Sequence, residues 1–237
     1  MTIRGEVHSV ARPGGASASR SLIYCPVIHS VVDLGALGAP VQTATRSAFG
    51  ADTWRRRVHT VDHMWTEIER LIDSMHLDLK RTRLYQDGLP VCEHELDIVK
   101  EMTYKGSLNH RILLRLHARG AALMGTESAP LLLQEYDLAK RLLAPDQGDL
   151  VHEDRDALQT QARDLLKARD RFIAERINTT LGPGEVGILF LGMLHDVTPW
   201  LDPDIQVAYP LGTPVGADAA GVVTRDDRDS DHVNTPN

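Results

Sequence analysis

Two histidines and several acidic residues follow predicted strands, where they could share one site. His29 comes directly after one apolar run, and His195 ends the motif Gly192-Met193-Leu194-His195 after another. The acidic residues that follow such runs are Asp33, Asp87, Glu127 and Asp196. Neutral imidazoles and carboxylates are ligands of transition metals, and they are also the common general acids and bases. The residue types therefore predict metal-assisted or acid–base chemistry, provided that the fold brings them together.

Short apolar runs alternate with longer amphipathic segments along the chain. The apolar runs predict strands at residues 22–28, 121–125, 186–191 and 205–209, and residues 82–86 can form a further strand. The segments between them repeat apolar residues at three- and four-residue steps, which is typical of helices, at residues 58–79, 93–104, 107–118, 130–143 and 153–179. Strands separated by helices predict an α/β fold: one domain with a central, mostly parallel sheet of four to five strands flanked by many helices.

The predicted sheet gives the candidate residues a common place. In an open parallel sheet, ligands bind beyond the carboxyl ends of the strands, and every candidate follows a predicted strand. We therefore expect the side-chain tips of His29, Glu127 and His195 to lie within roughly 10 Å of one another in one cleft. Each acidic residue also has a structural explanation. Asp87 can form an Asp-Gly turn, Glu127 can stabilise the positive end of the next helix, and Asp33 can end its loop.

Arg169 lies in the middle of an apolar stripe on the predicted helix 153–179. A guanidinium cannot lose its proton in a protein, so a buried arginine needs an anionic partner. One interpretation is a structural ion pair. The other is that Arg169 faces the cleft, paired with Asp33 or Glu127, and holds an acidic ligand or a developing oxyanion there. Arg176 shares the stripe, and we expect it to extend to solvent.

Composition limits the functional classes. The chain has 237 residues and a formal net charge of −7, which disfavours nucleic acid as a partner. Two cysteines exclude a disulfide scaffold and a four-thiolate zinc site. We find no apolar run of about 18 residues that would span a membrane and no secretory leader, so the expected location is cytoplasmic. We expect residues 1–20 to form a flexible arm and residues 21–211 to form the folded domain. We expect residues 212–237 to form a disordered acidic tail.

The C-terminal half resembles a known family. Arg169-Asp170 within a helical segment, followed by a hydrophobic strand that ends in Gly192-Met193-Leu194-His195, is similar to the closing motif of the TraB/PrgY/Tiki superfamily. That superfamily is related in fold to erythromycin-esterase-like and ChaN-like proteins. Its members also carry Gly-x-x-His after the first strand and Glu after the second. Here Pro26 replaces the glycine before His29, and Asp87 replaces the glutamate. The resemblance implies a TraB-like α/β domain and, since Tiki-type members are described as metal-dependent proteases, metal-dependent hydrolysis.

We expect a metal-assisted hydrolase of peptide or ester bonds, with a small molecule or peptide as its substrate. His29, His195 and Asp33 would hold a divalent transition metal such as zinc, manganese or cobalt. Glu127 or Asp87 would accept a proton from water, and Arg169 would stabilise charge on the substrate. The sequence lacks His-Glu-x-x-His and Gly-x-Ser-x-Gly, the motifs of zincins and of serine hydrolases.

Two alternatives stay open. In a metal-free hydrolase, His195 would act as the base, oriented by a carboxylate. In a non-catalytic protein of the same fold, the cleft would bind a small ligand or haem and serve regulation. The replaced glycine before His29 and the shorter acid at Asp87 favour the second alternative.

Overall fold

The computed structural model describes residues 19–143 and 152–212, with only the backbone described for residues 152–155. The predicted N-terminal arm and acidic tail lie outside these residues, except at Ser19, Arg20 and Gly212. Arg20 belongs to the first strand and not to the arm. Its guanidinium is buried, and it donates hydrogen bonds to the carboxylates of Asp202 and Asp204.

A five-stranded sheet forms the centre of the molecule, and every neighbouring pair of strands is parallel. The strands are β1 (Arg20–Val27), β2 (Thr82–Gln86), β3 (Ala122–Met124), β4 (Val186–Gly192) and β5 (Ile205–Ala208). Their order across the sheet is β3-β2-β4-β1-β5, so β4 lies between β1 and β2. The predicted α/β fold with a parallel sheet is confirmed.

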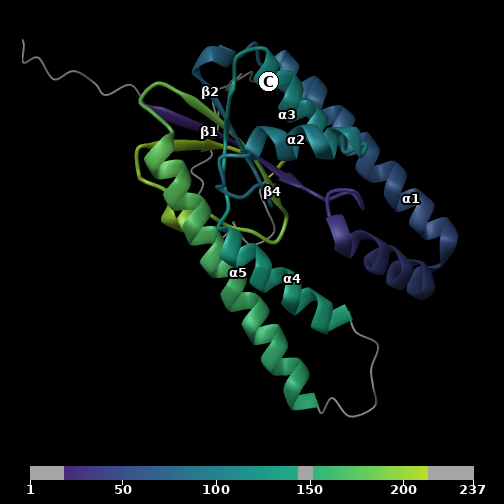
Figure 1. Cartoon of the computed structure of the whole chain (residues 1–237). Helices are drawn as coiled ribbons and strands as arrows, with labels where there is room; N and C mark the ends of the chain where they lie inside the picture. Colours follow the sequence, from purple (N-terminus) through teal and green to yellow (C-terminus); the bar gives the residue numbers. More distant parts are fainter. Residues whose placement is uncertain (1–18, 144–151, 213–237) are drawn as a thin grey trace, which may run out of the picture.

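Helices cover both faces of the sheet (Figure 1). The longer helices are α1 (Gly38–Ser74), α2 (Glu95–Tyr104), α3 (Leu108–Ala118), α4 (Ala129–Leu143) and α5 (His152–Thr180). Short 3-10 helices lie at Gly35–Leu37 (η1), Leu79–Arg81 (η2) and Thr198–Trp200 (η3). None of the helices in the described part of the chain combines the length and the apolar content needed to cross a bilayer.

The alternation of side chains along the strands divides the core into two layers. On one face, Ile188 and Phe190 of β4 pack with Trp65 of α1 and with residues of α2 and α3. On the other face, Leu189 and Leu191 of β4 pack with the second half of α5. Because both faces of the sheet are covered, the central strand β4 contains only apolar residues and glycine, as the sequence pattern predicts for a buried parallel sheet.

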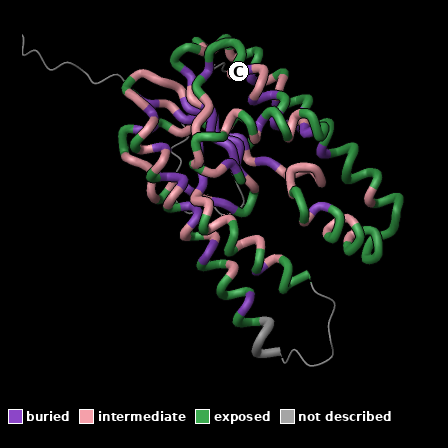
Figure 2. Tube along the Cα trace, in the orientation of Figure 1, coloured by how far each residue is buried: buried purple, intermediate pink, exposed green. Residues whose placement is uncertain are grey.

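Helix α1 begins at Gly38, well before the helix predicted at residue 58. Its first part is largely exposed, as the green segment of the tube in Figure 2 shows, so it has no apolar stripe that could reveal it in the sequence. A kink at Gly50, where φ is 82°, separates this part from the buried stripe that follows. The helix ends at Ser74, so Leu79 lies in η2 and not in the predicted helix.

Helices α4 and α5 form an antiparallel pair that extends beyond the sheet (Figure 1). Leu138 of α4 packs with Leu158 and Leu165 of α5 in a small separate core. Farther along α5, Ile173 and Ile177 pack against the sheet. Arg169 therefore lies where α5 passes from the helical pair onto the sheet.

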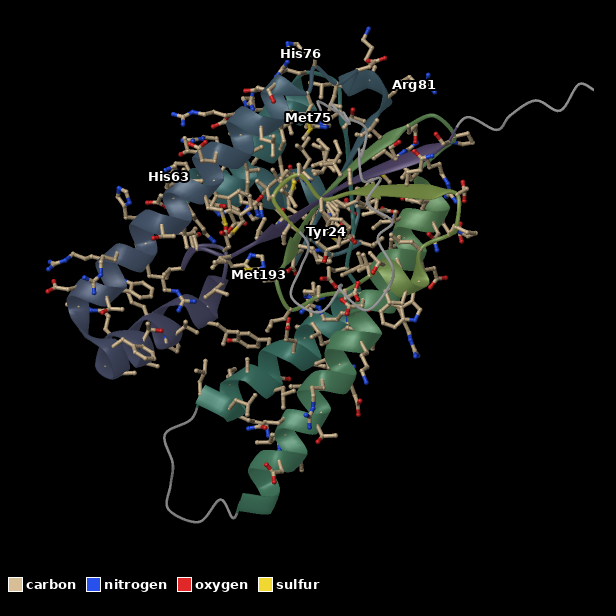
Figure 3. All side chains as sticks on the ribbon, turned by 180° about the vertical axis from the view of Figure 1, so that it is seen from behind. Tyr24, His63, Met75, His76, Arg81 and Met193 are labelled. Atoms are coloured by element: carbon tan, nitrogen blue, oxygen red, sulfur yellow. The ribbon has the colours of Figure 1, made fainter. Side chains whose placement is uncertain are left out.

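All strands end at the same side of the sheet. Arg81, just before β2, and Met193, just after β4, lie at opposite ends of the sheet in Figure 3. Loops follow the carboxyl ends of β1, β2, β3 and β4, and these loops therefore meet on the Met193 side. The start of α4 and the part of α5 around Arg169 lie close to them.

Candidate functional site

Backbone hydrogen bonds at the carboxyl ends of the strands fix two acidic residues. Asp87 follows β2, and its N–H donates to the carbonyl of Phe190 in β4 at 2.9 Å. Glu127 follows β3, and its N–H donates to the carbonyl of Leu89 at 3.0 Å, beside a parallel bridge between Pro90 and Glu127. Both carboxylates are thus positioned by extensions of the sheet, which makes their placement rigid.

Asp87, Glu127 and His195 form a buried cluster of potential metal ligands. One ligand atom from each residue lies within 4.8 Å of the other two. Glu127 is fully buried, and His195 is 5% exposed. Three strands of the sheet therefore bring two carboxylates and one imidazole to a single point.

His29 joins this cluster through Asp87. Its Nε2 lies 2.9 Å from Asp87 Oδ2, and the N–H of Gly192 donates to the same oxygen at 2.9 Å. A Cβ at position 192 would lie 3.0 Å from Asp87 Oδ2 and 3.4 Å from His29 Nε2. The glycine of the Gly-x-x-His motif is thus required for the close approach of three polar groups to the end of β4. The structure brings His29, Glu127 and His195 to one end of the sheet.

Arg169 points from α5 into the same cluster and is 3% exposed. Its Nη2 donates to Glu127 Oε1 at 2.6 Å and to Asp87 Oδ1 at 2.7 Å, and its Nε donates to Glu127 Oε2 at 3.3 Å. Its Nη1 donates to Glu135 of α4. Of the two partners predicted for Arg169, Glu127 is present, whereas Asp33 bonds elsewhere and Asp87 and Glu135 take its place.

Asp170, the neighbour of Arg169 on α5, holds His195. Asp170 Oδ1 is hydrogen-bonded to His195 Nδ1, and Asp170 Oδ2 accepts from the N–H of Asp196 at 3.2 Å. On the other side, the hydroxyl of Tyr24 in β1 donates to the carbonyl of His195 at 3.0 Å. The ring of His195 therefore has one nitrogen fixed by Asp170, while Nε2 lies 3.7 Å from Asp87 Oδ2.

Sequence reasoning assigned no role to Asp170, Tyr24 or Glu135. Asp170 carried a signal, because it stands beside Arg169 in the Arg-Asp pair of the resembling motif. Tyr24 lies within an apolar run and Glu135 within an amphipathic helix, where nothing in the local pattern distinguishes them from core and surface residues.

The two clustered carboxylates have different pKa values. Burial raises the pKa of Glu127 to about 7, although its bonds to Arg169 act in the opposite direction. Burial would also raise the pKa of Asp87, but the hydrogen bond from His29 and the positive charges of His195 and Arg169 lower it well below its ordinary value. Asp87 is therefore ionised at neutral pH, and Glu127 can gain and lose a proton there.

Both histidines of the site favour the charged form. Burial lowers the pKa of both rings, but for His29 the hydrogen bond to Asp87 and the charges of Asp87 and Asp33 together outweigh it. For His195 the hydrogen bond to Asp170 and the charges of Asp87 and Asp170 together do so. The net pKa of each ring lies above its ordinary value. Protonated imidazoles offset part of the negative charge around Arg169.

Asp33 lies outside the cluster, although the sequence placed it among the metal ligands. Its Oδ2 accepts from the N–H of Ser30 at 2.9 Å and from the hydroxyl of Ser30 at 2.7 Å. Its Oδ1 accepts from the hydroxyl of Ser107, which caps α3 as predicted by accepting from the N–H of His110. Asp33 therefore ties the loop after β1 to α3 and is not one of the clustered ligand residues.

Arg176 does not extend to solvent as predicted. Its Nε donates to the carbonyl of Gly125 at 3.2 Å, and the side chain is half-buried. The carbonyl at the end of β3 gives the guanidinium a partner that the sequence pattern did not reveal.

Comparison of the chain with protein-family models, with curated proteins and with solved structures found no match.

Proposed function

We propose that the protein is a hydrolase of peptide or ester bonds that uses a divalent transition metal held by Asp87, Glu127 and His195. One observation carries the proposal: the ligand atoms of these buried residues lie within 4.8 Å of one another. Burying a carboxylate costs free energy of folding unless the group is paired. Two buried carboxylates beside a buried histidine therefore indicate a functional site more than a structural one.

The donor set fits such an ion. Two carboxylates and one imidazole suit zinc, manganese and cobalt, and three protein ligands leave a position for water. The contact between Asp170 and His195 Nδ1 supports the proposal, because histidine ligands are usually oriented by a carboxylate on the other ring nitrogen. A bound ion would acidify a water molecule and polarise the scissile carbonyl.

Residues in and around the cluster would have separate roles in the reaction. Burial raises the pKa of Glu127 to about 7 in the metal-free protein, so binding of the ion near neutral pH would release a proton from this carboxylate. Arg169 balances the charge of the carboxylates and faces the negative charge that develops on the substrate. His29 orients Asp87 through its hydrogen bond to Oδ2.

A metal-free hydrolase is the second candidate, and the contact between Asp170 and His195 favours it as well. A carboxylate on Nδ1 fixes the tautomer of the ring and stabilises the imidazolium that forms when Nε2 takes a proton. The same contact joins the Arg169-Asp170 pair to the Gly-x-x-His motif in space. This supports the proposed relation to the TraB/PrgY/Tiki superfamily.

Hydrolysis assays on the purified full-length chain test these alternatives. We expect turnover of p-nitrophenyl esters or of a quenched peptide library that falls on chelation, returns with zinc, manganese or cobalt, and is lost in Glu127→Gln but not in His63→Ala. His63 serves as the control because its side chain is exposed on α1 (Figure 3). Turnover that resists chelation would support the metal-free route. Absence of turnover, together with binding of haem or a small ligand, would favour the non-catalytic alternative.

A further inference from the structure

The three carboxylates around Arg169 differ in how firmly they are held. Glu127 and Asp87 lie at the carboxyl ends of β3 and β2, where backbone hydrogen bonds fix them, and both are buried. Glu135 comes from α4, which is not part of the sheet layers. Its side chain is 46% exposed, against 4% for the side chain of Arg169. Glu135 is therefore the most solvent-exposed of the three carboxylates that contact the guanidinium.

The guanidinium has one edge that only Glu135 occupies. Nε and Nη2 are taken by Glu127 and Asp87, whereas Nη1 donates to Glu135 alone among the described residues. If Glu135 turned outward, its half-exposed carboxylate would gain contact with water, whereas the buried guanidinium would lose one partner. Nη1 would then be without an anionic partner on the side where Glu135 is exposed to solvent.

We propose that Arg169 Nη1 binds a carboxylate of the substrate and that Glu135 occupies this position in the free protein. An incoming carboxylate replaces one with the same charge and the same planar shape, so the charge balance of the cluster is unchanged. A hydrogen bond from the charged Nη1 to a carboxylate is also stronger than one to a neutral amide. The substrate class is thus an ester or amide with a free carboxylate near the scissile bond. This assignment rests on the proposed hydrolase function, whereas the binding itself does not require turnover.

A matched pair of small probes tests the binding. N-acetylglycine carries the carboxylate, and N-acetylglycinamide has nearly the same shape without the charge. Binding is measured by calorimetry and by the NMR signal of the Arg169 guanidinium in ¹⁵N-arginine-labelled protein, assigned with Arg169→Lys. The proteins are the wild type, Glu135→Ala and the control Asp137→Ala, which removes an exposed carboxylate from the same helix. Thermal melts show whether each variant is folded.

In Glu135→Ala we expect the dissociation constant of N-acetylglycine to fall about tenfold or more, since a competing charged group has been removed. The Arg169 signal should shift, and Asp137→Ala should match the wild type. Equal affinity in Glu135→Ala and the wild type would overturn the proposal. Equal binding of N-acetylglycinamide, or tighter binding of inorganic phosphate than of N-acetylglycine, would overturn it too. Because no outcome depends on turnover, failure of this proposal can be told apart from failure of the proposed hydrolase.

Discussion

Arg169 and Glu127 form a bidentate ion pair in the interior, with Nε and Nη2 of the guanidinium donating to both oxygens of the carboxylate. Asp87 accepts from Nη2 as well, so one cation faces two buried anions and the half-exposed Glu135. The pair joins the end of β3 to the middle of α5, and it sets the charge balance of the whole cluster.

Arg169→Met should destabilise the protein, because it leaves Asp87 and Glu127 buried without their cation. Removal of one partner of a buried pair costs about 3–5 kcal/mol in free energy of unfolding. The loss should be largest above pH 7 and smaller in acid, where Glu127 takes up a proton. Urea unfolding at several pH values measures it. The double variant Arg169→Met with Glu127→Gln should recover part of the loss; if it recovers none, the ion pair does not carry the stability.

Asp170→Asn should change the titration of His195. The hydrogen bond to Asp170 raises the pKa of His195, so an amide in its place should lower that pKa and weaken any activity that uses His195 Nε2. The ring resonances of His195 in an NMR pH titration report the change. Asp164→Asn, an exposed position on the same helix, is the control. A His195 titration that is the same in both variants would show that Asp170 does not hold the ring.

Gly192→Ala should disturb the contact between His29 and Asp87 more than the fold. The added methyl would lie 3.0 Å from Asp87 Oδ2, so one of the two side chains must move. Overpacking of this kind costs about 1–3 kcal/mol and moves the neighbouring side chain by a few tenths of an ångström. We expect a large loss of activity or metal affinity with a modest drop in the melting temperature. Met193→Ala, at the next and more exposed position, should leave both nearly unchanged. Full activity in Gly192→Ala would mean that His29 and Asp87 need not be in contact.

Asp33→Asn should remove a pH-dependent part of the stability. Burial raises the pKa of Asp33, but its bonds to His110, Ser107 and Ser30 outweigh this and lower the pKa from 3.8 to about 2. A lowered folded-state pKa stabilises the protein above pH 4, and this contribution is lost as the pH falls through 2. A shift of this size corresponds to about 2 kcal/mol.

Unfolding measured between pH 2 and pH 7 tests the role of Asp33. The wild type and Asp33→Asn should differ most near neutral pH and converge in acid. Because Asp33 lies outside the cluster, its replacement should leave metal content unchanged. A loss of metal in Asp33→Asn would restore Asp33 to the ligand set that the sequence predicted.

The sequence predicted the sheet well because β1 and β4 at its centre are buried on both faces and contain mostly apolar residues. It also predicted the inward direction of Arg169, because an arginine within an apolar stripe has few alternatives. The first part of α1 escaped prediction, since an exposed helix leaves no apolar stripe. The position of Asp33 escaped it too. Asp33 is close to His29 in the sequence, but its carboxylate is held by the hydroxyl of Ser107 at the start of α3. A contact between residues so far apart in the chain cannot be read from the local sequence.

The central claim is that Asp87, Glu127 and His195 hold a transition metal, and metal analysis of the purified chain tests it most directly. The protein is stripped with a chelator, offered zinc, manganese or cobalt, dialysed, and measured by mass spectrometry beside Asp87→Asn, His195→Ala and the control His63→Ala. The account predicts one ion for each wild-type and His63→Ala chain, and none in folded Asp87→Asn or His195→Ala. A wild type without metal, or full metal content in both site variants, would contradict it.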